Sequence, residues 1–538
     1  MQEVISNKTF SQKAAHVVDG IKDVFSAKSA YQRSLYRQAA KLTNQFGSYK
    51  GADRDRLKSS WIPGGKSADE DILFELPALR ERSRDLGRND ANVAGILRTF
   101  LVNVISQGIS VKPSLNAKRL KISDEKKEEI EEALKDVWTE WGKNCDVTGM
   151  HFECEAQPLI FRSFLENGES LIQITKKERS FRPFSTALNI IEPDRLETPF
   201  KLRQDKRIRS GVRVDSDGEP TGYWIKETHP GDMRLRDQKK SRNFKFVKAR
   251  DEFGNRNIIH YFEKMRPGQS RGVPEITPSL SIFKDLGESL EAEVIAQRIA
   301  ACIGIVIESE TDSLMPENTA MQKEEAVEPG MWKRLFPGEK MQAFMPQRPG
   351  FMWDTFVERM LRVVATQTGL PYELIGKDFS KVNMASARVA IDEARRRFRM
   401  MQTSFCELIV KEIYGRVMDE AFLIGRVPVN DFFAKRNLYL EVKRKLPGWP
   451  STEPLKDAKA IDTGLKNRSQ TLKNVYDSRG EDWENDGLEQ RKRELNKIEK
   501  LGLPEAGNTI KTIQEIVRTD GKSGSQKKEK EESKKDTE

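Results

Sequence analysis

The sequence contains few of the residues that build disulfide frameworks, histidine sites or membrane spans. Its 538 residues include four cysteines and four histidines, and so few cysteines indicate a reducing compartment without a disulfide framework. No apolar run is long enough to span a bilayer, so the sequence predicts no membrane partner. The first 20 residues contain no apolar segment of the kind found in secretory signals.

Motifs for nucleotide, zinc or hydrolytic chemistry are incomplete. Residues 59–67 (SSWIPGGKS) come within one residue of a phosphate-binding loop, but Ser60 replaces the first glycine and a polar segment precedes it. Cys145, His151 and Cys154 lie close together without a second ligand pair, so we interpret the cysteines as small buried residues. No histidine has a nucleophile or base partner in the sequence. We therefore predict no enzymatic activity, no cofactor and no metal site.

Charge is abundant and unevenly distributed. The chain is 33% charged, with a net charge of +10 and a mean hydropathy of -0.66. Basic residues dominate 1–60 and 201–250, whereas residues 275–293 carry five acids and one lysine. Basic surface indicates contact with a polyanion or an acidic partner. An acidic helix nearby argues against a simple DNA-clamping protein.

Residues 75–273 are predicted to form an α+β domain after a basic N-terminal arm, 1–74. A helical pattern over residues 76–113 ends in a short apolar strand. Lys121–Trp141 predicts an amphipathic helix. Alternating strand-like segments follow, and Asp215–Gly218 is typical of a hairpin turn. The buried face of the amphipathic helix should contain Ile130, Leu134, Val137, Trp138 and Trp141.

Two long helices then bracket an irregular insert. The first is expected within 274–301, with Thr277 as its N-cap, and the second within 351–368, with Asp354 as its N-cap. The insert, 302–350, is rich in proline and glycine. This order of elements is typical of a protein built into a larger assembly.

A third helix is predicted from near Asn383 to Leu423, about 60 Å long at 1.5 Å per residue. Pro428–Glu441 looks strand-like, residues 430–505 contain a small helical domain, and 506–538 should be disordered because the last residues lack apolar side chains. An apolar stripe on the third helix predicts core packing or a subunit interface. It consists of Ala394, Phe398, Met401, Phe405 and Leu408.

Two charged groups on the long helices allow more than one interpretation. The acids of the first helix fit one solvated side better than a metal site. They are Asp285, Glu288, Glu291 and Glu293. Arg395, Arg396 and Arg397 fit a solvated face paired with acids such as Asp392 and Glu393, with inter-subunit ion pairs and phosphate contact as the alternatives.

Several local patterns, in the same order, resemble the portal proteins of tailed bacteriophages, in the lambda-like branch. The matching segments cover most of residues 75–505, and each is weak by itself while their order is specific. They are RSRDLGRNDANVAGILRTFLVNVISQGISVKP, the Trp138 and Trp141 pair, CDVTGMHFECEAQPLIFRSFLENGESLIQI, IEPDRLETP, RPGQSRGVPEITPSL, GLPYELIGKDFSKVNMASARVA, LPGWPSTEPLKDAKA and DWENDGLEQRKRELNKIEKLGLP.

The resemblance implies a portal fold that forms a ring of about twelve subunits, as head-to-tail packing of identical chains allows. The implied parts are an α+β wing (75–273), stem helix 1 (274–301), a small α/β clip (302–350), stem helix 2 (351–368), a tunnel loop (369–383), the long wing helix (384–429) and a helical crown (430–505).

The resemblance also implies partners and a location. Double-stranded DNA would pass through the ring, the terminase large subunit and later a head–tail connector or tail protein would dock on it, and the major capsid and scaffold proteins would surround it. The chain would reside in the virion and, during assembly, in the host cytoplasm. In the tunnel loop, Lys377, Lys381 and Asn383 would face DNA, although both lysines also fit plain exposed turns. An acidic stem would discourage DNA from sticking.

Two other functions stay open on the sequence alone. A nuclease or NTPase acting on DNA would need a clustered acidic site or a phosphate-binding loop, neither of which is evident. A DNA-binding protein that forms no ring would use the basic N-terminal arm and bind with strong salt dependence.

Overall fold

The chain divides into two units, residues 1–66 and 67–538, and nearly all of the described residues belong to the second. The structure, a computed structural model, describes residues 64–180, 182–232, 243–301, 305–309, 339–343, 352–450 and 453–479, with isolated positions elsewhere. Residues 59–63 of the phosphate-loop-like segment, the basic arm up to residue 63 and the C-terminal tail lie outside these ranges, apart from Leu35.

The second unit begins with helices, several of which have N-termini capped by polar side chains. Ser67 accepts a hydrogen bond from the Glu70 amide and begins α3. Asp90 ends α4 and begins α5, because its carboxylate accepts from the Val93 amide. In α7 the five predicted residues are all buried. The helices of this part are α3 (Ala68–Ile72), α4 (Leu76–Asn89), α5 (Ala91–Val104), α6 (Ala117–Leu120), α7 (Asp124–Gly142), the π-helical turn η2 (Phe152–Ala156) and α8 (Gln157–Asn167).

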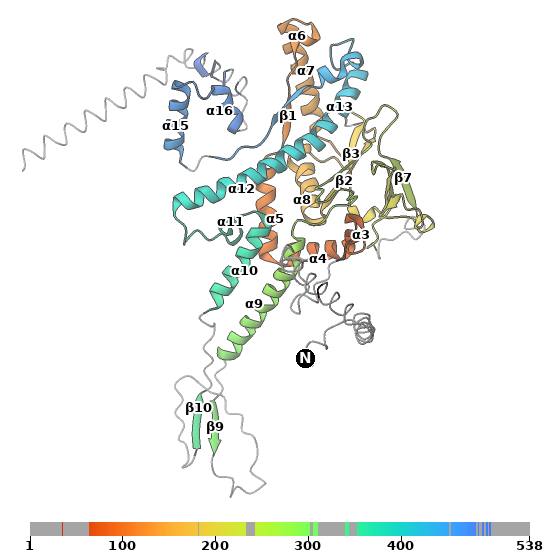
Figure 1. Ribbon diagram of the computed structural model, residues 1–538. Helices are drawn as coiled ribbons and strands as arrows, with labels where there is room; N and C mark the ends of the chain where they lie inside the picture. The colour runs from red at the N-terminus through yellow and green to blue at the C-terminus, as the bar shows by residue number, and fades with distance from the viewer. Residues whose placement is uncertain are drawn as a thin grey trace, which may run out of the picture. The chain divides into compact units, whose positions relative to one another are not determined.

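Two antiparallel sheets complete the α+β part. In the first, β2 lies between β3 and β8, and α8 packs against it (Figure 1). The second has the order β4-β5-β6-β7. The predicted turn Asp215–Gly218 is confirmed, since it joins β5 to β6 with Gly218 at a φ of 86°. The strands are β2 (Glu169–Lys176), β3 (Thr186–Ile191), β4 (Ile208–Arg209), β5 (Val212–Val214), β6 (Pro220–Lys226), β7 (Phe244–Lys248) and β8 (Ile258–Phe262), with 3-10 turns η3 (Pro193–Arg195) and η4 (Phe200–Leu202).

The two bracketing helices are present, but neither predicted cap is. Thr277 lies in a 3-10 turn, η6 (Thr277–Ser279), where its hydroxyl donates to the Pro274 carbonyl, and α9 begins at Leu280. Asp354 lies inside the first turn of α10. The elements are α9 (Leu280–Ala301), the antiparallel pair β9 (Ile305–Ser309) and β10 (Glu339–Ala343), α10 (Trp353–Thr368) and α11 (Tyr372–Gly376). The rest of the insert lies outside the described residues.

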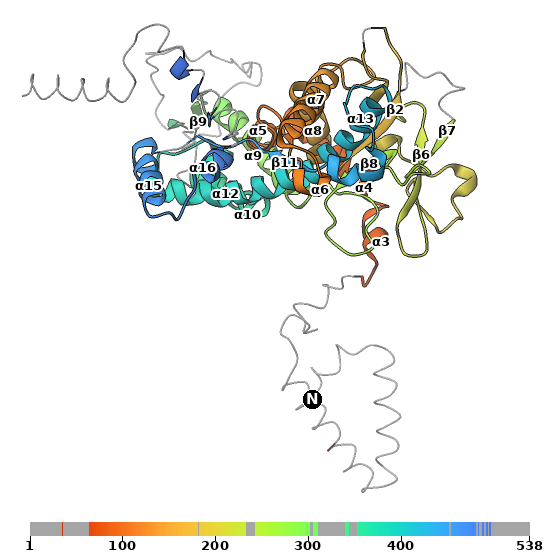
Figure 2. The same cartoon turned by 90° about the horizontal axis from the view of Figure 1, so that it is seen from above.

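The predicted third helix is confirmed, with one irregular turn in its middle. It consists of α12 (Met384–Phe405), a π-helical turn η8 (Cys406–Val410) and α13 (Lys411–Leu423). Asn383 begins it by accepting a hydrogen bond from the Ser386 amide. Figures 1 and 2 both show α13 beside α7. The helix therefore carries residues from the neighbourhood of α11 into the centre of the core.

The prediction of a strand over Pro428–Glu441 is wrong. This segment forms short helical turns, because Phe432 and Tyr439 must both reach the core, where their rings stack. The strand comes later, as β11, which pairs with β1 near the start of the unit. The elements are η9 (Phe433–Lys435), α14 (Arg436–Tyr439), β11 (Val442–Lys445), β1 (Ser110–Pro113), α15 (Pro454–Lys466) and α16 (Leu472–Arg479).

A large apolar core joins α5, α7 and α8 with β2, β3 and β8 and with the long helix. A smaller core lies between the two sheets. Among the described residues, no helix combines the length and the apolar character that crossing a bilayer requires. The observed class is thus mixed helix and sheet, as predicted.

Candidate functional site

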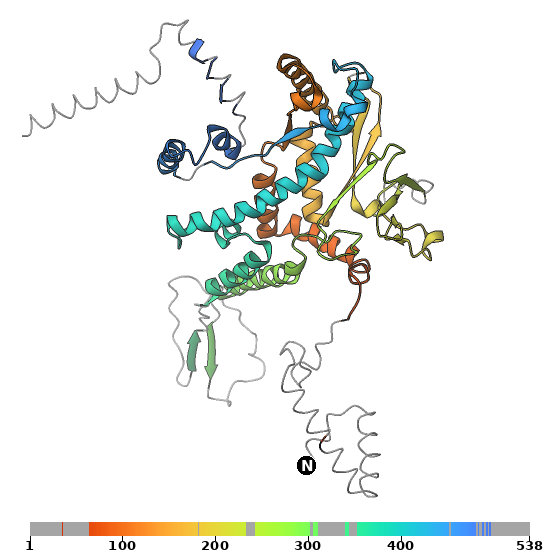
Figure 3. The same ribbon diagram turned by 45° about the horizontal axis from the view of Figure 1, so that its top comes forward.

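The helices α9 and α10 run side by side (Figures 1 and 3). Near the core they are well packed, since Phe283 and Leu286 of α9 and Val364 of α10 are buried. Polar contacts reinforce this end: the Ser279 hydroxyl donates to Gln367, whose amide nitrogen donates to the Glu275 carbonyl. The core end of the pair is therefore fixed by both packing and hydrogen bonds.

Farther along the pair, apolar side chains become exposed. Leu290, Val294 and Ile295 of α9 are 37%, 46% and 48% exposed, and Phe356 of α10 is 46% exposed. On α9, Leu290 and Val294 continue the side of the helix that is buried at Phe283 and Leu286. The single chain thus leaves an apolar surface, defined by Leu290, Val294, Ile295 and Phe356, uncovered within the described residues.

The predicted acidic side of α9 is only partly correct. Asp285, Glu288 and Glu291 are exposed, and Glu288 pairs with Lys284 at 3.5 Å. Glu293, in contrast, is buried. It lies seven residues after Leu286 and so returns to the packed side of the helix. The solvated side consists of three acids.

Each polar residue predicted to face DNA in segment 369–383 anchors that segment to a neighbouring element. The Lys377 ammonium donates to the Thr99 hydroxyl of α5 at 2.9 Å. Lys381 pairs with Glu358 of α10 at 3.0 Å, and this carboxylate raises the pKa of Lys381. Asn383 is the N-cap of α12. The loop is held from three sides while both lysines stay exposed at the surface.

The three consecutive arginines of α12 have different surroundings. Arg395 pairs with Asp392 at 3.2 Å, as predicted, and lies 5.7 Å from the Trp449 ring. Arg396 is exposed. Arg397 instead pairs with Glu275, just before α9. The arginines therefore do not form one solvated face, because Arg397 ties α12 to the base of the α9–α10 pair.

Most of the predicted apolar stripe on the long helix is core. Ala394, Phe398, Met401 and Phe405 are buried, with Phe398 edge-to-face against Phe100. The core-packing interpretation is wrong for Leu408, which is 41% exposed. The π-helical turn η8 changes the helical register there, so that neighbouring side chains enter the core instead.

The ion pair between Glu275 and Arg397 joins a buried carboxylate to a half-buried guanidinium. Burial raises the pKa of Glu275 to about 7, although Arg397 acts in the opposite direction. Removing water strengthens the attraction between the two groups but also makes the charged carboxylate costly. This ion pair joins the long helix to the base of the α9–α10 pair. It weakens when the Glu275 carboxylate is protonated.

Comparison with known proteins shows the family to which the chain belongs. Residues 54–402 match the family described as phage portal protein, lambda family. The chain belongs to that portal protein family. It is 26% identical to the probable portal protein of Halomonas phage phiHAP-1, over 87% of this chain and 89% of that protein. It is 23% identical to the portal protein of Escherichia phage N15 and 22% to portal protein B of Escherichia phage lambda, each covering 62% of this chain and 67% of the relative.

Solved structures similar to this portal chain come from gene transfer agent particles. One is described as the virion of a native particle, with a TM-score of 0.41, 12% identity and coverage of 78% of this chain and 96% of that chain. Another is the neck of a native particle computed with C12 symmetry, with a TM-score of 0.38, 13% identity and coverage of 73% and 91%.

The sequence interpretation missed a buried charge cluster in the portal chain. Glu169 is fully buried and accepts hydrogen bonds from Arg80 at 2.5 Å, from Arg271 at 2.5 and 2.8 Å, and from the Gly272 amide at 2.9 Å. His260 lies 2.9 Å away. The only sequence signal was an acid at the start of a strand that alternates polar with apolar residues. The cluster joins α4, β2 and β8 to the segment that leads into α9.

The cysteine and metal interpretations can also be checked. Cys145 is buried, as expected, but Cys154 is exposed, so the interpretation is wrong for that residue. The one potential metal-ligand group found in the described part of the portal chain is Glu192, Asp194 and His229. Arg84 already pairs with both carboxylates. These acids thus have a cationic partner from the protein itself.

Proposed function

We propose that this portal chain assembles into a closed ring of about twelve subunits at one capsid vertex and that double-stranded DNA enters and leaves the capsid through the ring. The virion is its final location, and assembly takes place in the host cytoplasm. Membership of the portal family supports this proposal. The observation that carries it is the apolar surface of α9 and α10, which one chain leaves uncovered.

That apolar surface calls for a partner, because exposed apolar patches of this kind mark interaction sites. A second copy of the same helix pair, related by rotation, presents the same elements in a new orientation. Head-to-tail contacts of this type close into a ring when the rotation closes. We therefore assign residues 274–301 and 351–368 to a stem. In the proposed ring, the stems of all subunits surround the central axis.

The remaining segments are assigned to the other parts of the proposed portal by their place in the chain relative to the stem. Residues 302–350 form the clip, where the terminase large subunit docks during packaging and the head–tail connector or tail docks later. Residues 75–273 and 384–429 form the wing, whose basic region at 201–250 meets scaffold and major capsid protein. Residues 430–505 form the crown inside the capsid.

The charges near the proposed axis suit a conduit. The exposed acids Asp285, Glu288 and Glu291 repel phosphates, so they oppose tight binding along the stem. Lys377 and Lys381 supply two exposed cations in the proposed tunnel loop, residues 369–383. A surface of this kind lets DNA slide with brief contacts.

Electron microscopy of the purified protein, viewed down the ring axis, tests the proposal. We expect rings with a central hole and cyclic symmetry near twelvefold. Replacing Leu290 and Val294 by glutamate should prevent ring formation, because carboxylates would be buried between subunits. A matched variant with glutamate at Ser281 and Ala292, both exposed on the acidic side of α9, should still form rings.

The opposite results would reject the proposal. A monodisperse monomer at all salt concentrations, with or without scaffold protein, would contradict the ring. Turnover of ATP or DNA by the pure wild-type protein, abolished by one acidic or lysine substitution, would support the enzyme alternative. Tight, salt-dependent DNA binding by that monomer would support a DNA-binding protein that forms no ring.

A further inference from the structure

The two-stranded ribbon β1–β11 has one basic face and one mainly apolar face. Its register pairs Ser110 with Lys445 and Lys112 with Lys443. Directly opposed residues of antiparallel strands share a face, and alternate residues do as well. One face thus carries three lysines and a serine. On the other face Val111, Pro113 and Val442 are buried or half-buried, and Arg444, opposite Val111, is exposed.

Like charges directly opposite each other disfavour a sheet. The pairing of Lys112 with Lys443, with Lys445 two residues away, therefore concentrates positive charge that packing does not require. The core needs only the other face of the ribbon, where Val111 is buried. This is the sequence pattern expected of a surface that meets an anion.

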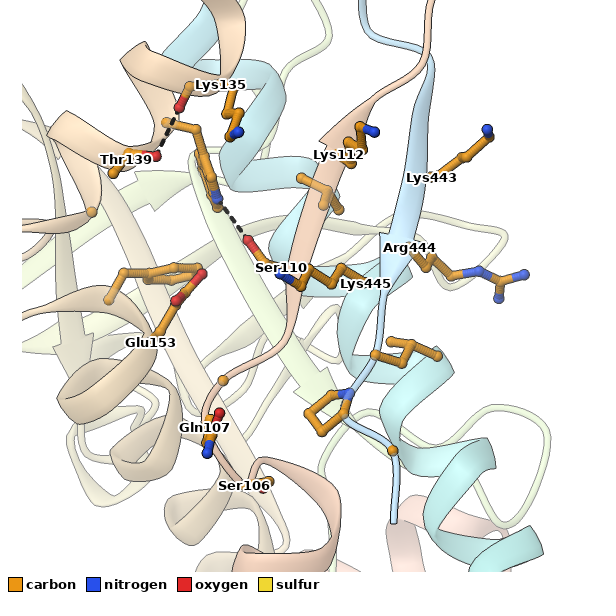
Figure 4. Close-up of a pocket in the computed structure, with 18 of the residues that line it drawn as sticks. Ser106, Gln107, Ser110, Lys112, Lys135, Thr139, Glu153, Lys443, Arg444 and Lys445 are labelled. Carbon is orange, nitrogen blue, oxygen red and sulfur yellow. Dashed lines mark hydrogen bonds between the residues drawn. The ribbon is translucent and has the colours of Figure 1, made fainter. Parts of the chain in front are cut away.

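The basic face borders a cleft of about 790 Å³ between the ribbon and α7, shown in Figure 4. Besides the three lysines of the basic face, three further cations line it: Arg444 of the same ribbon, Lys135 of α7 and Arg479 of α16. Two acids, Glu153 and Asp477, also line it. The charged side chains of the lining are therefore mostly cationic.

Two of these cations have no counter-charge in the part of the chain that the structure describes. Within the described ranges, neither Lys135 nor Lys445 has an ion-pair partner, and both are exposed. Arg444, in contrast, lies 3.6 Å from Glu407. The cleft therefore has capacity for an external anion.

We propose that this cleft, defined by Lys112, Lys135, Lys443 and Lys445, binds the phosphate backbone of double-stranded DNA without reading its sequence. The site is separate from the proposed channel loop, and the choice of DNA as ligand rests on the proposed function. Lysine ammonium groups act as mobile point charges, which suits a row of phosphates. Ser106, Gln107 and Thr139 add polar groups to the same lining.

The lining favours DNA over an acidic peptide. A peptide gains specificity from open apolar pockets for its side chains. The aromatic residues of the lining, Trp138 and Phe152, are 6% and 1% exposed, and the Trp138 indole already donates to Ser110. They form the floor of the cleft and offer no such pocket. A lysine-rich lining above the buried Trp138 and Phe152 fits a sugar-phosphate backbone.

Fluorescence anisotropy with a labelled short duplex and the full-length protein, over a range of salt concentrations, tests the site. The variant has glutamine at Lys135, Lys443 and Lys445. Because each lost phosphate contact lowers the slope of log affinity against log salt by about 0.9, this slope should fall by about 2 to 3. The matched control has glutamine at three exposed lysines of the second sheet region, Lys201, Lys245 and Lys248, and should keep the wild-type slope.

Circular dichroism and urea unfolding check that both variants fold. If the triple variant does not fold, the single changes Lys135→Gln and Lys445→Gln should each lower the slope by about 0.9. An unchanged slope in folded variants overturns the proposal. If the variants lose binding to poly-glutamate but keep binding to DNA, the proposal is also overturned, and the cleft binds an acidic peptide instead. Electron microscopy of the same samples reports ring formation separately, so failure of the ring and failure of this cleft are distinguishable.

Discussion

Single buried charges determine how the α+β part is joined to the rest of the chain. Burial opposes ionisation of Glu169, but Arg271, Arg80 and His260 hold its pKa well below the usual range. A carboxyl group with a depressed pKa adds stability above its ordinary value of 4.5, and that stability is lost as the pH falls through the folded-state pKa. Glu169 thus contributes throughout the neutral range.

Replacing Glu169 by glutamine should destabilise the protein by about 3–5 kcal/mol, because the buried Arg271 loses its counter-charge and the buried Arg80 keeps only Asp194, 3.5 Å away. Urea unfolding at fixed protein concentration measures this loss. Asp462→Asn removes one partner of an exposed ion pair with Lys466 and should change stability by no more than about 0.5 kcal/mol. Equal effects of the two changes would mean that the Glu169 cluster contributes no more than a surface pair.

Glu275 should produce a pH dependence of the opposite sign. Its pKa is raised from 4.5 to about 7, so the folded state binds more protons than the unfolded state between these values. Stability is then highest below pH 4.5 and falls as the pH rises through 7. The urea midpoint of the wild type should decrease across this window, whereas Glu275→Gln should flatten that component. Identical pH profiles for the two proteins would contradict the assignment.

At the scale of the elements, the π-helical turn η8 decides which side of the long helix enters the core. Ile409 is completely buried, whereas its neighbour Leu408 is 41% exposed. A regular 3–4 apolar spacing makes either residue a candidate for the core. The π-helical turn η8 directs Ile409, and not Leu408, into the core.

This selection predicts unequal effects for two adjacent, chemically similar changes. Ile409→Ala should cost about 2–5 kcal/mol, as expected for a buried aliphatic side chain. Leu408→Ala should cost less than about 1 kcal/mol, since its side chain is partly in solvent. Urea unfolding compares the two. A larger loss for Leu408 would show that this residue is covered, for instance by a neighbouring subunit.

Sequence patterns identified most elements but not the contacts that join them. The face of α7 and the hairpin turn at Asp215 follow from local periodicity and turn chemistry, which one segment encodes by itself. Glu169 and Glu275 were missed because their partners are distant in sequence. Pro428–Glu441 was misread because the aromatic side chains that suit a strand also suit short helical turns whose rings reach the core.

At the scale of the whole molecule, the proposed tunnel loop should affect DNA without affecting assembly. Alanine at Lys377 and Lys381 removes two exposed cations, while Asn383 still caps α12. We expect rings of normal appearance in electron microscopy and altered packaging or retention of DNA in assembled particles. Normal packaging and retention would leave both lysines as anchors of the loop only, consistent with their contacts to Thr99 and Glu358.

The β1–β11 ribbon also constrains the order of events during synthesis. Residues 110–113 leave the ribosome early, but their only strand partner within the described residues is 442–445. Likewise, Glu420 supplies the acceptor for the Ser185 and Thr186 amides. Contacts so distant along the chain form late and slowly. A nascent chain therefore cannot close its core until translation has passed residue 445, and truncated chains should be excluded from the proposed ring.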